Sequence, residues 1–160
     1  MTDTLENFCA DATAALKASS GIGGREAVRC RLEKLLNSID FIQLYLVNQS
    51  RGKKILFEDP ETGFLINAHG ISKNNKIGKP HDHGTSWAIY GQASGLTNMT
   101  VWEQNHPVSK SEIPSLTQQK TFVLKPGNAA LFDTGIIHST AHPAPARWVR
   151  ITGTDLNTIK

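Results

Sequence analysis

Short strand-like runs dominate the chain from Phe41 onward and restrict the folds that it can adopt. Gly, Pro, Asn and Asp separate these runs, and this spacing is typical of an all-β sandwich or barrel. The segment 105–115 predicts a long loop, either a lid over the barrel mouth or a plain connector. The strands that we expect cover 41–47, 53–58, 63–71, 79–83, 85–93, 96–104, 119–124, 128–133, 136–141 and 147–154.

The beginning of the chain carries a helical pattern instead. Apolar residues recur at helical spacing over 3–18 and over 25–38. Asp3 and Glu6 have the spacing of a capping box at the first of these helices. We expect both helices to cover one side or end of the barrel, with a dimer contact as the alternative. The chain is therefore predicted to be a single domain, 1–160, with a helical segment, 1–39, and a β-barrel, 40–160.

Composition sets several functional classes aside. With 160 residues, of which 39% are hydrophobic, the chain can bury one core. The net charge of +3 comes from scattered basic residues, which does not indicate nucleic-acid binding but favours small anionic molecules. Neither an apolar run of membrane-spanning length nor a signal-peptide pattern is visible. We expect a cytoplasmic monomer or homodimer with no membrane partner.

Two histidines separated by one residue indicate a metal site. Side chains alternate between the faces of a strand, so His81 and His83 should point the same way and could share one ion. A third ligand must come from elsewhere, and His138 is the candidate, because it follows a turn at Gly135 in a strand-like segment. The alternative is that these histidines only satisfy hydrogen bonds.

The histidine pair resembles the first of the two sequence motifs of cupins, the small β-barrel metalloproteins. That motif is His-x-His followed by Glu and then Gly, and it matches here at His81, His83 and Gly95. Ala88 stands at the position of the acidic ligand. The resemblance implies a mainly β cupin fold, a double-stranded β-helix or jelly-roll barrel, with the two N-terminal helices packed on it.

The second cupin motif is matched later in the chain. Its glycines and its histidine correspond to Gly127, Gly135 and His138, whereas Asp133 and His142 replace its Pro and Asn. The resemblance implies that His138 completes the ligand set. His142 is expected to donate a hydrogen bond beside the site, with a solvated loop histidine as the alternative.

A cupin without the acidic ligand is similar to the thiol dioxygenases, cysteine dioxygenase and 3-mercaptopropionate dioxygenase, which bind iron with three histidines. Segment 80–88 follows the mercaptopropionate-type sequence, and Ala88 falls where cysteine dioxygenase has its cross-linking Cys, which excludes a thioether. The resemblance implies iron(II) as cofactor. Three imidazoles leave about three cis positions for substrate and O2. Zinc is the main rival, with nickel and manganese as further alternatives.

The same resemblance assigns residues to the substrate. Lys53 stands where the family has the Arg that pairs with the substrate carboxylate. A lysine keeps the charge but not the two-pronged guanidinium fork. Trp87 is expected to line the pocket and Tyr90 to bring a hydroxyl to the metal. A solvated lysine and ordinary core aromatics are the alternatives.

The C-terminal strand departs from the family pattern. Family members place Ser, His and Tyr at alternate positions facing the iron, and these positions hold Trp148, Arg150 and Thr152 here. If the register carries over, Arg150 points into the barrel and pairs with the substrate carboxylate. Its apolar neighbours favour the opposite orientation, with Arg150 in solvent. The sequence leaves both orientations open.

These residues predict a mononuclear non-haem iron(II) dioxygenase that oxidises a small anionic thiol to a sulfinate with O2. One alternative is another metal-dependent cupin enzyme, such as a dioxygenase that cleaves carbon–carbon bonds or a zinc or nickel enzyme. A non-catalytic cupin that binds a small molecule is the other. Apart from the metal ligands, the sequence assigns no catalytic residue.

Overall fold

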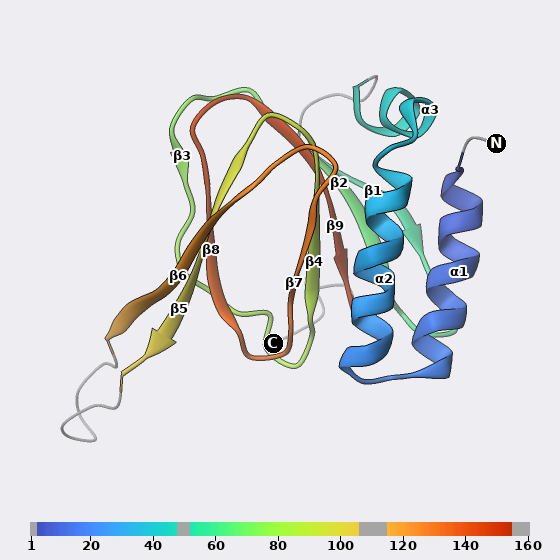
Figure 1. The fold of residues 1–160 in the computed structure, drawn as a ribbon, viewed down its shortest axis with the longest axis horizontal. Helices are drawn as coiled ribbons and strands as arrows, with labels where there is room; N and C mark the ends of the chain where they lie inside the picture. Colours follow the sequence, from blue (N-terminus) through green and yellow to red (C-terminus); the bar gives the residue numbers. More distant parts are fainter. Residues whose placement is uncertain (1–2, 48–51, 106–114, 155–160) are drawn as a thin grey trace.

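Two antiparallel β-sheets face each other, with helices packed against one of them (Figure 1). The computed structural model describes residues 3–47, 52–105 and 115–154. In chain order the elements are α1 (Leu5–Ala18), α2 (Ile22–Leu35), α3 (Ile39–Ile42), the π-helical turn η1 (Gln43–Val47), β1 (Gly52–Glu58), β2 (Leu65–Ile71), β3 (Lys76–Ile77), β4 (Ala88–Ser94), β5 (Thr97–Gln104), β6 (Leu116–Leu124), β7 (Ala129–Phe132), β8 (Ile137–His142) and β9 (Ala146–Thr152).

The larger sheet has the strand order β1-β2-β9-β4-β7, and the smaller sheet has the order β3-β8-β5-β6. Neighbouring strands in both sheets are antiparallel. Helices α1 and α2 lie on the outer face of the larger sheet, and the smaller sheet lies on its other side (Figure 1). Both faces of the larger sheet are therefore covered, whereas many antiparallel sheets leave one face in solvent.

Strand β9 shows how the two faces divide. Val149 and Ile151 are fully buried in the core between this sheet and the helices, which also contains Phe8 and Leu32. Trp148 packs instead with the cluster inside the barrel. Because side chains alternate along a strand, Arg150, which lies between Val149 and Ile151, faces the barrel interior. The face of β9 that packs against the helices is thus apolar, and Arg150 lies on the opposite face, inside the barrel.

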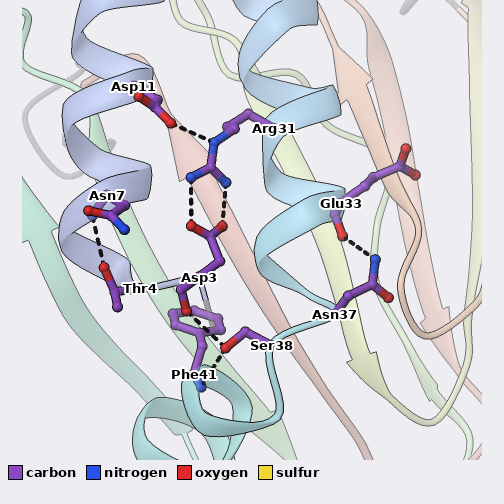
Figure 2. Close-up of polar contacts among 9 residues, drawn as sticks. All are labelled: Asp3, Thr4, Asn7, Asp11, Arg31, Glu33, Asn37, Ser38 and Phe41. Atoms are coloured by element: carbon purple, nitrogen blue, oxygen red, sulfur yellow. Dashed lines mark hydrogen bonds and ion pairs between the residues drawn. The ribbon is translucent and has the colours of Figure 1, made fainter. Parts of the chain in front are cut away.

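Ion pairs join α1 to α2. The Arg31 guanidinium contacts both carboxylate oxygens of Asp3, with Nη2 to Oδ1 at 2.8 Å, and its Nε donates to Asp11 at 2.7 Å (Figure 2). The expected capping box of Asp3 and Glu6 is wrong. Thr4 is the N-cap of α1, and Asp3 is used by Arg31. No helix in the described ranges is long and apolar enough to span a membrane.

The start of α2 differs from the sequence prediction. This helix begins at Ile22 rather than at residue 25. A glycine is needed at position 24 because α1 passes very close, so that an added Cβ would lie 2.0 Å from the Ser19 carbonyl oxygen. Gly24, which looks like part of a helix break in the sequence, thus serves the close packing of two helices.

Two predicted strands are also wrong. Segment 41–47 is helical, because the Ser38 hydroxyl accepts a hydrogen bond from the Phe41 N–H at 3.3 Å and caps α3 (Figure 2). Segment 79–83 forms only an isolated bridge at His81. Pro80 lacks the N–H that a ladder requires. The other predicted strands are confirmed with shifted ends, β3 was not predicted, and residues 106–114 of the expected lid or connector lie outside the described residues.

Candidate metal centre

His81, His83 and His138 meet inside the barrel. His81 and His138 lie opposite each other in an antiparallel bridge, in which each N–H donates to the other's carbonyl oxygen at 2.9 and 2.8 Å. The Nε2 atoms of His83 and His138 are 3.2 Å apart. One ring nitrogen from each residue lies within 4.8 Å of those of the other two. The structure therefore brings together the three residues that the sequence predicted as ligands.

Hydrogen bonds fix how two of these rings are turned. His81 Nδ1 lies 2.9 Å from the Lys79 carbonyl oxygen, and His138 Nδ1 lies 3.1 Å from that of Ile136. A carbonyl can only accept, so Nδ1 carries the proton and Nε2 keeps its lone pair. Backbone carbonyls commonly orient metal-binding histidines in this way.

Burial keeps the inner histidines neutral. Burial, together with electrostatic repulsion from His138 and His81, lowers the pKa of His83 to about 3. Burial also lowers the pKa of His138 to about 4. Neutral imidazoles are the form that binds a metal. His81 is exposed, so the group is accessible from solvent on that side.

The donors in this group fit a transition metal. Three imidazole nitrogens suit iron, zinc or nickel better than magnesium or calcium, which prefer oxygen ligands. Ala88, at the acidic position of the cupin motif, is fully buried and lies in the core cluster inside the barrel. Its methyl side chain offers no atom that could bind a metal.

Tyr90 brings a hydroxyl to the same place. Its oxygen lies 3.3 Å from His83 Nε2 and 3.2 Å from His138 Nε2. Phe132 packs against both Tyr90 and His138. Its ring stacks on His138 at a centroid distance of 4.2 Å and meets the Tyr90 ring edge-on at 5.6 Å. Burial raises the pKa of Tyr90, whereas the positive charge of Arg150 and its side-chain hydrogen bond with Tyr90 work against this effect. The hydroxyl therefore keeps its proton at neutral pH.

Arg150 points into the barrel. It pairs directly with Tyr90 of β4 on one side and with Asn67 of β2 on the other, so these three side chains form one row across neighbouring strands. Its Nε is buried, without a hydrogen-bond partner among the described residues. None of the ion pairs within the described ranges includes Arg150. Of the two orientations that the sequence left open, the inward one is observed, because the helices bury the other face.

The neighbours expected beside the ligands lie further along the barrel. Trp148 stacks between His142, at a centroid distance of 4.2 Å, and His69, at 5.2 Å. His142 Nδ1 is 3.1 Å from the Thr97 hydroxyl. Thr152 is buried, and its hydroxyl donates to a backbone carbonyl oxygen at residue 154. These residues shape the interior of the barrel, and none of these contacts reaches the three histidines.

Two expected substrate residues lie away from the histidines. Trp87 belongs to the core on the helix side of the sheet, with the Arg25 guanidinium 5.9 Å from its ring centroid. Its neighbour Ala88 takes the interior face, so alternation turns Trp87 to the helix side and not toward the three histidines, where we expected it to line the pocket. Lys53 is exposed on β1, opposite His69.

Sequence reasoning missed Asn67, and found no role for His69. Both lie on β2 and alternate with Ile66 and Ala68, which pack on the helix side. The available signal was a polar residue at every second position of an otherwise apolar strand. That pattern usually indicates a solvated face, whereas here the second sheet covers it.

No protein-family model matches the sequence, and neither does any curated protein. Solved structures with a similar fold include the cupin domain of Cnp3 from Schizosaccharomyces pombe, with 14% identity, a TM-score of 0.52 and coverage of 69% of this chain and 67% of that chain. A cupin superfamily protein from Desulfitobacterium hafniense has 13% identity, a TM-score of 0.49 and coverage of 67% and 84%. KdgF from Halomonas sp. has 16% identity, a TM-score of 0.47 and coverage of 62% and 74%.

The fold is therefore that of a cupin, a jelly-roll of two antiparallel sheets with N-terminal helices packed on it, as the sequence predicted. Within that fold, the three histidines form a group that could hold a metal ion. At these identities the likeness establishes the fold alone.

Proposed function

We propose that this cupin is a mononuclear non-haem iron(II) dioxygenase that oxidises a small anionic thiol to a sulfinate. In this reaction a thiolate and O2 give a sulfinate, so sulfur supplies all the electrons that reduce O2 and no other reductant is needed. The observation that carries the proposal is the row from Tyr90 to Arg150 beside the three histidines. It combines neutral metal donors, a protonated hydroxyl and a cation that has no carboxylate partner among the described residues.

His81, His83 and His138 would hold the iron through their Nε2 atoms. Iron(II) would supply the redox chemistry with O2 that protein side chains cannot supply. Backbone carbonyls keep the rings of His81 and His138 turned in the required direction before any ligand binds. Such preorganisation lowers the cost of assembling the site.

Arg150 would bind and orient the substrate. Its guanidinium is the cation in the row with Tyr90, and a carboxylate is the natural partner of a buried arginine. Neighbouring strands lie about 4.8 Å apart, so a carboxylate on Arg150 would leave the other end of a small molecule near Tyr90 and the histidines. Fixing both ends of the substrate in this way promotes reaction.

Tyr90 would hold a proton at the reacting centre. Its hydroxyl keeps that proton because burial raises the pKa of Tyr90. It would donate a hydrogen bond to negative charge on the reacting sulfur or oxygen, which lowers the barrier in an enclosed site. The hydroxyl that the family pattern places on the C-terminal strand would thus come from β4.

The main rival is a zinc cupin, because zinc also accepts three histidines and a water molecule. Metal analysis of protein purified without chelators separates the two. Protein loaded anaerobically with iron(II) should then consume one O2 per sulfinate formed from thiols that carry a carboxylate. Thiols of similar size without a carboxylate should react far more slowly. Bound zinc, or no O2 uptake with any thiol on iron-loaded protein, would contradict the proposal.

A further inference from the structure

Four buried polar atoms inside the barrel are without hydrogen-bond partners among the described residues. They are both amide atoms of Asn67, Nε2 of His69 and Nε of Arg150. Asn67 is 0% exposed, so solvent does not reach its side chain. Native proteins rarely leave buried polar groups unsatisfied, because each such group costs stability. A cluster of them on adjacent strands calls for a ligand.

The four atoms share one face of the larger sheet. Asn67 of β2 is paired with Arg150 of β9, which is paired with Tyr90 of β4. His69 lies two residues further along β2, on the same face, where its ring stacks on Trp148. The cluster therefore begins at Arg150 and extends away from the metal ligands, with Asn67 about two strand spacings, roughly 10 Å, from Tyr90.

The surroundings of this cluster are positively charged. Burial is the main cause that lowers the pKa of His69 to about 3, and the charged neighbours that lower it further are Arg150 and Lys53. Lys53 is paired with His69 across β1 and β2. No ion pair within the described ranges neutralises either cation. An anionic ligand is favoured here, and an additional ammonium group is disfavoured.

We propose that Asn67, His69 and Arg150 form a subsite for the end of a 2-hydroxy acid, an assignment that rests on the proposed function because the same substrate would reach the metal. The carboxylate accepts hydrogen bonds from Arg150 Nε and Asn67 Nδ2. The adjacent hydroxyl donates to Asn67 Oδ1 and pairs with His69 Nε2. All four atoms then have partners. A plain carboxylate would leave Asn67 Oδ1 without a donor, and an amino acid would place its ammonium among cations.

Three probes of the same size test this ligand class: lactate as each enantiomer, propionate and alanine. They differ at one position, which carries a hydroxyl, a hydrogen or an ammonium group. Calorimetric titration at fixed ionic strength should show that one lactate enantiomer binds wild-type protein at least about tenfold more tightly than propionate or alanine. In Asn67→Leu, which keeps the shape but removes both amide atoms, lactate and propionate should bind equally weakly.

Thermal unfolding supplies a second readout. Asn67→Leu removes unsatisfied polar atoms, so its Tm without ligand should rise. Gln92 is the matched control, because this buried amide on β4 is satisfied: its Oε1 accepts from Thr97 at 2.9 Å and its Nε2 donates to a backbone carbonyl at 3.1 Å. Gln92→Met should lower the Tm.

Three results would overturn the subsite: equal binding of lactate and propionate to wild-type protein, a lactate preference that persists in Asn67→Leu, or a fall in Tm for Asn67→Leu as large as that for Gln92→Met. A persisting preference would mean that the hydroxyl binds the metal instead, since Asn67→Leu keeps all three histidines. Binding of lactate through Asn67 without O2 uptake for any thiol would support the subsite and contradict only the proposed reaction.

Discussion

The hydroxyl of Tyr90 lies 3.2 Å from His138 Nε2, across the interior of the barrel. Tyr90 belongs to β4 in the larger sheet, and His138 belongs to β8 in the smaller one. The contact therefore depends on how the two sheets face each other. It places the tyrosine hydroxyl beside the nitrogen that would bind the metal.

Replacing this hydroxyl should separate metal binding from turnover. Tyr90→Phe keeps the ring contact with Phe132 and all three histidines, so the metal content should be unchanged. Loss of a positioned proton donor should lower kcat for thiol oxidation roughly 100-fold. Oxygen uptake by iron-loaded protein measures the effect, and an unchanged kcat would remove Tyr90 from the mechanism.

Removal of the Arg150 guanidinium should stabilise the protein and weaken substrate binding. Arg150→Met takes away a guanidinium that has no carboxylate partner in the described ranges, so the free energy of unfolding should rise by about 1 kcal/mol. The KM for an anionic thiol should rise at least about tenfold. Arg147→Met on the same strand is the control and should destabilise, because Arg147 donates to the Leu46 carbonyl. A destabilised Arg150→Met with an unchanged KM would contradict the assignment.

Gly95 should be hard to replace. It has a φ of +69°, and an added Cβ would lie 2.5 Å from the Pro145 carbonyl oxygen. Gly95→Ala should therefore lower the free energy of unfolding by about 3 kcal/mol, from strain and clash together. Gly135→Ala isolates the strain, because its φ is +79° but nothing lies within 4 Å, and should cost only about 1 kcal/mol. Denaturant unfolding measures both, and equal costs would show that the close approach is absent.

The contact between Asp3 and Arg31 should make stability depend on acid. The Arg31 hydrogen bond holds the pKa of Asp3 below its ordinary value of 3.8, although burial works against it. A lowered folded-state pKa means that the stabilisation is complete above the unfolded-state pKa and is lost as pH falls through the folded one. Asp3→Asn should therefore cost about 1–3 kcal/mol at neutral pH. The difference in unfolding free energy between wild-type protein and Asp3→Asn should shrink below about pH 4. Denaturant unfolding at several pH values measures it, and a difference that does not change with pH would show that the contact is not formed.

The sequence predicted the histidines and the turns because both depend on local chemistry. The glycines of the two motifs, Gly95, Gly127 and Gly135, all have positive φ. A His-x-His pair with a later histidine was enough to predict the three histidines that the structure brings together, even though the segment of the pair is not a regular strand.

The substrate side of the site could not be predicted in the same way. Alternation in β9 shows that Arg150 and its apolar neighbours face opposite ways, but the sequence does not show which face the helices cover. A role for Asn67 becomes visible only from its cross-strand pairing with Arg150, which lies more than eighty positions later in the sequence. Such pairings belong to the tertiary structure.

The metal content of wild-type protein and of His138→Ala tests the central claim most directly. Both proteins are purified without chelators, loaded with iron(II) under anaerobic conditions and desalted before elemental analysis. His142→Asn, at a buried histidine outside the group of three, is the control. Wild-type protein and the control should hold about one metal ion per chain, and His138→Ala should hold almost none while staying folded. Equal metal loading in wild-type protein and His138→Ala would contradict the account.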